Sequence, residues 1–191
     1  MRPRSPALAG LLLFAGLVLN VPAAAQGDAK RGAYLAKAGG CVGCHTEERN
    51  GATPFAGGRA LKTPFGTFYG PNITPHATAG IGAWKEHDFI RAMREGRRPD
   101  GAHYFPAFPY PSFTRIVDAD LKDLFAFLRS LPPSSQASRE HELPFPFGYR
   151  FLLWGWKWLF FSPGPFAPDP SRDARLNRGA YLVDALGHCG E

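Results

Sequence analysis

Sulfur is scarce in this sequence. The 191 residues include three cysteines and two methionines, and one methionine is the first residue. An odd number of cysteines excludes a framework in which every thiol is paired in a disulfide within the chain. Each cysteine, and Met93 as the one internal methionine, is therefore a candidate for a specific chemical role.

Long apolar runs and basic clusters are also missing. The two most apolar stretches, residues 7–19 and 149–161, are each 13 residues long, which is short of the roughly 20 residues that a membrane-spanning helix needs. The formal net charge is +6, but the basic residues are not gathered in one place. This distribution does not favour nucleic-acid binding.

The first 25 residues have the pattern of a secretory signal peptide. Arg2 and Arg4 precede the first apolar run, and the small residues Ala23 and Ala25 follow it. We predict cleavage after Ala25, with an uncleaved membrane anchor as the alternative. Export predicts a periplasmic location, where unpaired cysteines call for an explanation.

The pattern Cys41-x-x-Cys44-His45 supplies an explanation for two of the unpaired cysteines. It is typical of a redox dithiol, of part of a zinc site, or of c-type haem attachment. A thioredoxin-like dithiol belongs to a βαβ unit, which the flanking sequence does not show, and a structural zinc site needs a second ligand cluster, which is missing. Haem attachment needs only two thiols for thioether bonds and the adjacent histidine as axial iron ligand. We predict a covalent haem c here.

Three helical patterns predict a small all-α fold around that haem. Asp28 is placed to cap a helix that runs to Ala38, where two glycines follow. A second helix precedes Gly96, and Asp118 is placed to cap a third, which two prolines stop after residue 131. The intervening segments, such as residues 63–75, are rich in turn residues.

Each helix carries one apolar face. The residues at helical spacing are Tyr34, Leu35 and Ala38 in the first helix, Phe89, Ile90 and Met93 in the second, and Leu121, Leu124, Phe125, Leu128 and Leu131 in the third. We expect the first and third helices to cross through these faces. The core is small, so the haem must supply much of its apolar filling, and we expect Cys41, Cys44 and His45 to line an apolar pocket with residues from 81–113.

Five segments in a fixed order give the chain a specific resemblance. They are "RGAYLAKAGGCVGCHT", "TPFGTFYGPNITP", "GIGAWKEHDFIRAMREG", "YFPAFPYPSF" and "LPFPFGYRFLLWGWKWLFFSPGPF". From Asp28 onward the chain resembles a class I cytochrome c domain, and more narrowly the multihaem cytochrome c subunits of periplasmic, membrane-associated dehydrogenases for alcohols, aldehydes and sugar acids. The resemblance implies a class I cytochrome c fold and a place in a dehydrogenase complex.

An internal repeat extends the resemblance. "RGAYLAKAGGCVGCH" from Arg31 recurs as "RGAYLVDALGHCGE" from Arg178, an offset of 147 positions (178 − 31). We interpret the second copy as the first helix of another haem domain, cut off after Cys189, its first haem cysteine. A chain that ends here with Cys189 as a free thiol is the alternative. The predicted organisation is a signal peptide (1–25), a cytochrome c domain (26–133), a linker (134–170) and the truncated second domain (171–191).

The sixth iron ligand departs from the family pattern. Relatives of this type commonly carry a methionine in "PAMPY", where this chain has Phe108 in "PAFPY". Phenylalanine cannot ligate iron, whereas a thioether is the usual partner of histidine in cytochromes that move electrons. Met93 is our candidate, with His103 and His87 as competitors. Met93 as an ordinary core residue, with five-coordinate iron, also stays open.

The linker changes composition abruptly. After a polar stretch, nine aromatic residues lie between Phe145 and Phe161, with only two cations among them. Such a segment suits an interfacial position at a membrane surface. It equally suits packing between two haem domains or against a partner subunit.

These features predict an electron-transfer protein, not an enzyme. It would carry electrons from a dehydrogenase toward quinone or a terminal oxidase by redox cycling of haem iron. The alternative is a haem enzyme of the peroxidase or thiosulfate-oxidising type with an open or labile sixth position, which only Phe108 favours. A purely structural module cannot explain the haem motif.

Overall fold

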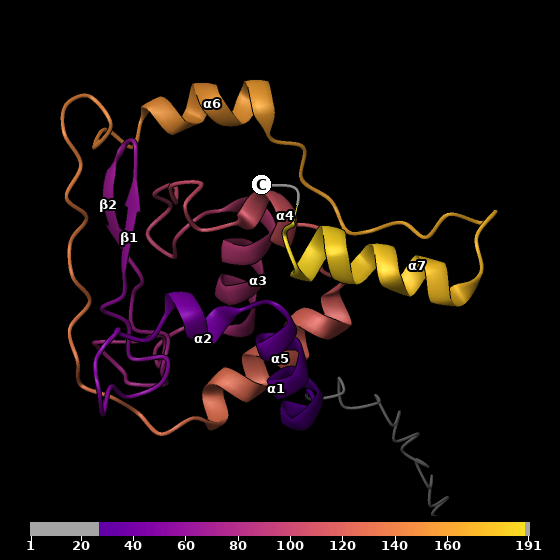
Figure 1. The fold of residues 1–191 in the computed structure, drawn as a ribbon, viewed down its shortest axis with the longest axis horizontal. Coiled ribbons are helices and arrows are strands. Elements are labelled where there is room, and N and C mark those ends of the chain that lie inside the picture. The colour runs from indigo at the N-terminus through magenta and orange to yellow at the C-terminus, as the bar shows by residue number, and fades with distance from the viewer. Residues whose placement is uncertain (1–26, 190–191) are drawn as a thin grey trace, which may run out of the picture.

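The structure, a computed structural model, describes residues 27–189. The predicted signal peptide therefore lies outside the described residues. The elements are α1 (Ala29–Ala38), α2 (Cys41–Cys44), β1 (Ala60–Thr63), β2 (Gly66–Tyr69), α3 (Glu86–Glu95), α4 (Tyr110–Phe113), α5 (Asp118–Ser130), α6 (Leu152–Phe160), α7 (Ala174–Tyr181) and a π-helical turn, Leu182–Leu186 (Figure 1). In this range no helix has both the length and the apolar character to cross a bilayer.

Helices α1 and α5 cross as predicted, and Leu35 lies in the core with residues of α5, but Tyr34 and Ala38 do not. The crossing is at Gly32, where a Cβ atom would overlap the carbonyl oxygen of Asp123, so only glycine allows the two backbones to approach this closely. Leu35 is buried there, whereas Tyr34 is 53% exposed and Ala38 is also exposed. The prediction placed Tyr34 and Ala38 in the interface because it followed large apolar residues and ignored the glycine.

The ends of the helices follow the sequence signals closely. The Asp28 carboxylate accepts hydrogen bonds from the amides of Lys30 and Arg31 and caps α1. Helix α3 ends at Gly96, which has a φ of 58°, a left-handed conformation that glycine adopts readily. Helix α5 differs slightly, since Asp118 is its first residue rather than its cap.

A β-hairpin corrects the prediction of an all-α fold. Strands β1 and β2 pair antiparallel in the register Ala60↔Tyr69 to Thr63↔Gly66. A two-residue loop with Pro64 joins them, and Gly66 has a φ of 119°. Leu61 is partly buried and Phe68 is buried in a small second core. The described residues therefore form helices together with one small two-stranded sheet.

The first part of the predicted linker is bound to the domain. Buried Asn72 donates hydrogen bonds from Nδ2 to the carbonyl oxygens of Ser134 and Gln136, both at 2.8 Å. Further along, the backbone of Thr67 exchanges two hydrogen bonds of 2.9 Å with that of Glu142. Residues 134–142 therefore run along β2 and the segment after it, rather than hanging free.

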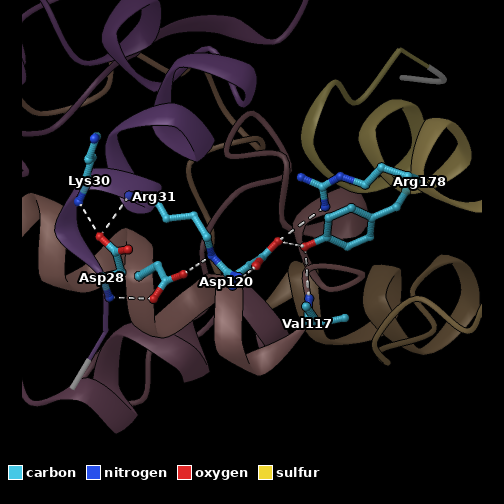
Figure 2. A network of polar contacts seen from close by, with 8 residues as sticks. Asp28, Lys30, Arg31, Val117, Asp120 and Arg178 are labelled. Atoms are coloured by element: carbon cyan, nitrogen blue, oxygen red, sulfur yellow. Dashed lines mark hydrogen bonds and ion pairs between the residues drawn. The ribbon is translucent and has the colours of Figure 1, made fainter. Parts of the chain in front are cut away.

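The repeated segment near the C-terminus packs onto the first domain. The hydroxyl of Tyr181 donates a 2.8 Å hydrogen bond to Asp120 on α5 and accepts one from the amide of Val117. Asp120 also binds Arg31 of α1, so a single carboxylate connects both copies of the repeat to α5 (Figure 2). Ala185 and Leu186 are buried in the main core. The prediction of a second, truncated domain at residues 171–191 is not tested by this packing.

Candidate functional site

The Cys41-x-x-Cys44-His45 motif forms one helical turn. Gly39 ends α1, Gly40 adopts a φ of 64°, and α2 begins at once with Cys41. The turn closes with a 3.1 Å hydrogen bond from the amide of His45 to the carbonyl oxygen of Cys41. Residues three apart lie on the same side of a helix, so the two thiols share one side of the turn.

The segments before and after the β-hairpin both contact this turn, through Gly57 and Gly70. A Cβ atom at Gly70 would overlap the carbonyl oxygen of Cys44, and the amide of Gly57 donates a 2.7 Å hydrogen bond to the carbonyl oxygen of His45. The glycine in "TFYGPN" is thus required by a close approach of two backbones. The hairpin of β1 and β2, which the sequence analysis did not predict, positions this loop.

The imidazole of His45 is held in one tautomer. Its Nδ1 lies 2.7 Å from the carbonyl oxygen of Pro71, and because a carbonyl can only accept, Nδ1 carries the proton. The lone pair is then on Nε2, which is the arrangement that metal-binding histidines use. Burial lowers the pKa of His45, which favours the neutral, ligating form. The donor set therefore fits a covalently bound haem.

The Cys41 thiol lies at the edge of the main core, whereas Cys44 is not among the residues packed against it. Cys41 packs against the cluster that contains Met93, Phe113 and Leu186, and burial raises the pKa of its thiol to about 11, so it is neutral at physiological pH. A cavity of about 420 Å³ adjoins the same turn, but Val42, Gly43 and Thr46–Asn50 with Arg59 line it. That cavity is not the predicted apolar pocket, because Cys41, Cys44 and His45 do not line it.

The side chain of Met93 is buried in the core, as expected from its predicted place on the apolar face of α3. It is buried on α3 with Phe89, in the cluster against which Cys41 packs. His87 lies on the exposed side of the same helix, 3.2 Å from Asp88, so it does not face the core. His103 is partly buried, and its Nδ1 is a buried atom without a hydrogen-bond partner among the described residues.

Phe108 fills the position where the family pattern has methionine. It packs against the main core and makes an edge-on ring contact with Phe113, with centroids 5.8 Å apart. Tyr104 and Tyr110 make ring contacts with Phe108 as well. An aromatic cluster thus replaces a possible ligand in this loop.

Lys157 connects the linker to the helix that carries Met93, whereas the sequence had suggested an interfacial position for this residue. Its Nζ donates hydrogen bonds to the carbonyl oxygens of Glu95 at 2.5 Å and Gly96 at 2.8 Å, at the end of α3. The ammonium also lies 4.5 Å from the centroid of the Tyr110 ring. A cation is favoured at a helix C-terminus because the macrodipole is negative there. The signal was available in the sequence as the only charge within α6.

Cys189 lies beside the first domain. It is exposed, and its neighbour His188 packs edge-on against the ring of Phe113 at 5.6 Å. Among the described residues, no group of three or more His, Cys, Asp or Glu side chains is arranged to bind a metal ion. The structure does not test Cys189 as a haem cysteine.

The fold and the Cys41–His45 turn are those expected of a c-type cytochrome. The comparison with known sequences agrees with this assignment. The chain belongs to the cytochrome c family, because the family's sequence model matches residues 29–132. Membership of this family implies covalent haem c.

Curated relatives make the resemblance more specific. The chain is 51% identical to a nicotinate dehydrogenase subunit of Pseudomonas putida over 160 residues, 84% of this chain and 13% of the relative. It is 43% identical to a diheme cytochrome c-type protein of Cereibacter sphaeroides over 187 residues, 94% of this chain and 58% of the relative. It is 44% identical to the gluconate 2-dehydrogenase cytochrome c subunit of Pantoea cypripedii over 164 residues, 84% of this chain and 36% of the relative. The chain thus spans less than two thirds of each of these relatives, and the predicted resemblance to dehydrogenase cytochromes is confirmed.

Proposed function

We propose that the chain is a periplasmic c-type cytochrome that takes electrons from a dehydrogenase and passes them toward quinone or a terminal oxidase. The observation that carries the proposal is the turn from Cys41 to His45, with His45 Nδ1 fixed on the carbonyl oxygen of Pro71. The names of the relatives support a dehydrogenase as the electron donor. They favour an electron carrier over the haem enzyme of the alternative prediction.

The residues have separate roles in this proposal. Cys41 and Cys44 would form the thioether bonds to haem, and His45 and Met93 would supply the two protein ligands of its iron. When bound, haem supplies one-electron chemistry at its iron. The protein holds His45 in the ligating tautomer and surrounds the thiols with apolar side chains. Phe108 and its aromatic neighbours help to exclude water from the loop that contains them.

The proposal also covers the ends of the chain. Residues 1–25 act as the export signal, and residues 171–191 begin a second cytochrome c unit in which Cys189 is the first haem cysteine. The repeat of "RGAYL" at positions 31 and 178 supports this interpretation. Association with the outer surface of the inner membrane, at residues of the linker, completes the proposed setting.

Covalent attachment is tested by haem staining after denaturing electrophoresis. We expect Cys41→Ala/Cys44→Ala to lose the stain, because no thioether can form, whereas the matched variant Cys189→Ala keeps it. Staining of the double variant at the wild-type level would refute attachment at this motif.

Electron transfer is distinguished from substrate chemistry by the absorption spectrum. We expect a six-coordinate, low-spin haem that is reduced and reoxidised reversibly and whose spectrum added cyanide leaves unchanged. A high-spin spectrum that shifts on addition of cyanide would instead support the haem enzyme.

A further inference from the structure

Asn50 and Gly51 form an exposed turn shortly after the haem-attachment motif. They are the one Asn-Gly pair in the sequence, and both residues are exposed. Gly51 has a φ of 72°, a left-handed conformation that glycine adopts readily. A Cβ atom placed on Gly51 would meet no atom of the described residues within 4 Å. The backbone after Asn50 is therefore open to attack and to rearrangement.

The two groups that could react in this turn are free of hydrogen bonds to the rest of the described chain. The turn is closed by a 3.2 Å hydrogen bond from the amide of Ala52 to the carbonyl oxygen of Arg49. That bond leaves the two central residues unpaired. Within residues 27–189, neither the side-chain amide of Asn50 nor the backbone amide of Gly51 takes part in a hydrogen bond.

The other two asparagines of the described residues are held in place. Asn72 is 3% exposed, and its side chain donates to two carbonyl oxygens and accepts from the amide and the hydroxyl of Thr74. Asn177 lies within α7 and donates from Nδ2 to three carbonyl oxygens. Each is followed by a residue with a bulky side chain, Ile73 or Arg178. Asn50 therefore differs from both in exposure, bonding and neighbour.

We propose that Asn50 is a site of spontaneous deamidation, which converts its neutral amide into a carboxylate. The backbone nitrogen of Gly51 loses its proton and attacks Cγ of Asn50, a C–N bond forms, and the side-chain nitrogen leaves as ammonia. Water then opens the resulting five-membered imide at one of its two carbonyl groups. The product is aspartate, or isoaspartate with the main chain running through the former side chain. The net reaction consumes one water molecule and involves no oxidation or reduction.

The new charge would lie beside the haem-attachment turn. Asn50 lines the cavity of about 420 Å³ that adjoins this turn. The two cations of the cavity wall are already paired, Arg49 with Glu47 at 2.6 Å and Arg59 with Glu48 at 2.9 Å. A further carboxylate therefore makes the wall net negative. Negative charge near the iron stabilises the ferric form over the ferrous form, so deamidation lowers the midpoint potential. This consequence, unlike the reaction itself, rests on the proposed haem function.

Incubation of the folded holo-protein at mildly alkaline pH, followed by peptide mass spectrometry, tests the reaction. We expect the amide at position 50 to be lost while those at Asn72 and Asn177 are retained, and an isoaspartyl methyltransferase to label the product. Asn50→Gln is the matched control, because its longer side chain does not form the five-membered ring and should keep its amide. Asn50→Asp supplies the charge without incubation. Redox titration should give a lower midpoint potential for incubated wild type and for Asn50→Asp, and an unchanged one for incubated Asn50→Gln.

Each contrary outcome has a distinct meaning. Retention of the Asn50 amide in the protein, under conditions in which a free peptide of residues 46–54 deamidates, would overturn the proposal. Equal conversion at Asn72 and Asn177 would also overturn it, because the reaction would then depend on unfolding and not on this turn. An Asn50→Asp protein with the wild-type potential would refute the effect on the iron. The mass measurement requires no haem, so failure of the proposed haem function would be seen separately, as loss of the haem stain.

Discussion

His45 owes its orientation to a neutral main-chain carbonyl. The acceptor is that of Pro71, in the loop that follows β2, rather than a carboxylate. A carboxylate partner would increase the basicity of the imidazole, whereas a carbonyl fixes the tautomer with less effect on its charge. The ligand is thus set by the backbone of a loop, whose position depends on Gly70.

The identity of the sixth ligand is tested at Met93. We expect Met93→Leu, which keeps the side-chain volume, and Met93→Ala to convert the haem from low spin to high spin and to remove the weak near-infrared band of sulfur ligation. Absorption spectroscopy of the ferric protein measures both changes. His103→Ala serves as the comparison, and a spectrum that changes there but not in the Met93 variants would move the ligand to His103.

Lys157 predicts a pH dependence of stability. Burial, and secondarily the charge of Arg97, lowers the pKa of Lys157 to about 8 from its ordinary 10.5. Between these two values the unfolded chain binds more protons than the folded chain, so the contribution of this group to the free energy of unfolding rises with pH. We expect wild type to gain stability relative to Lys157→Met as the pH is raised from 8 to 10.5.

Denaturant titrations at several pH values measure this difference. Lys37→Met, at an exposed position on α1, should follow the wild-type profile because Lys157 is still present. Parallel profiles for wild type and Lys157→Met would show that the lysine does not change its protonation on unfolding in this range.

At the scale of the elements, the sequence predicted the helices better than the faces they bury. Asp28, Gly96 and the prolines after residue 131 mark helix ends through local chemistry, so the bounds of α1 and the C-terminal ends of α3 and α5 could be predicted. Which side of α1 packs against α5 depends on the close approach of the two backbones at Gly32. That approach is part of the tertiary structure, so no local pattern in the sequence indicates it. The hairpin was missed because four-residue strands give too short a pattern to distinguish from turns.

The role of Gly32 at the crossing of α1 and α5 can be tested by comparison with Gly179, the corresponding residue of the repeat. Gly32→Ala would place a methyl group on the Asp123 carbonyl, and we expect a loss of about 1 to 3 kcal/mol in the free energy of unfolding, the usual range for overpacking. At the corresponding residue of the repeat, Gly179, a methyl group would meet no atom of the described residues within 4 Å. Gly179→Ala should therefore leave stability unchanged or raise it by up to about 1 kcal/mol, through helix propensity.

Thermal unfolding of the two variants makes the comparison. Equal effects of the two substitutions would mean that the close approach of α1 and α5 does not limit stability. A loss confined to Gly32→Ala would support the observed crossing.

At the scale of the whole molecule, one carboxylate and one lysine join segments that are distant in the chain. Asp120 receives Arg31 from α1 and Tyr181 from α7, and Tyr181 is only 4% exposed where its counterpart Tyr34 is 53% exposed. The two copies of "RGAYL" therefore use different faces against the same helix. Sequence similarity identified the two copies of the repeat. It did not indicate which side of each copy packs against α5, because that depends on the tertiary structure.

The haem motif was predictable in full because its chemistry is contained in five consecutive residues. Its support was not, because Pro71 and Gly70 contact the turn from another segment through backbone atoms, and Lys157 reaches the end of α3 from the linker through its Nζ. Lys157 in particular is separated from Glu95 and Gly96 by 62 and 61 residues. No local pattern reports such a contact.

The position of Lys157 has a thermodynamic consequence. One ammonium group both leaves the outer side of α6 uncharged and holds the end of α3, the helix of Met93. Two equilibria that share a residue are linked, and linkage is reciprocal. A displacement of α6 would break the two hydrogen bonds that Lys157 makes to the end of α3, so the positions of these two helices are coupled. We expect Lys157→Met to speed amide hydrogen exchange at the end of α3, because its last carbonyls lose a donor, and Lys37→Met to leave that exchange unchanged.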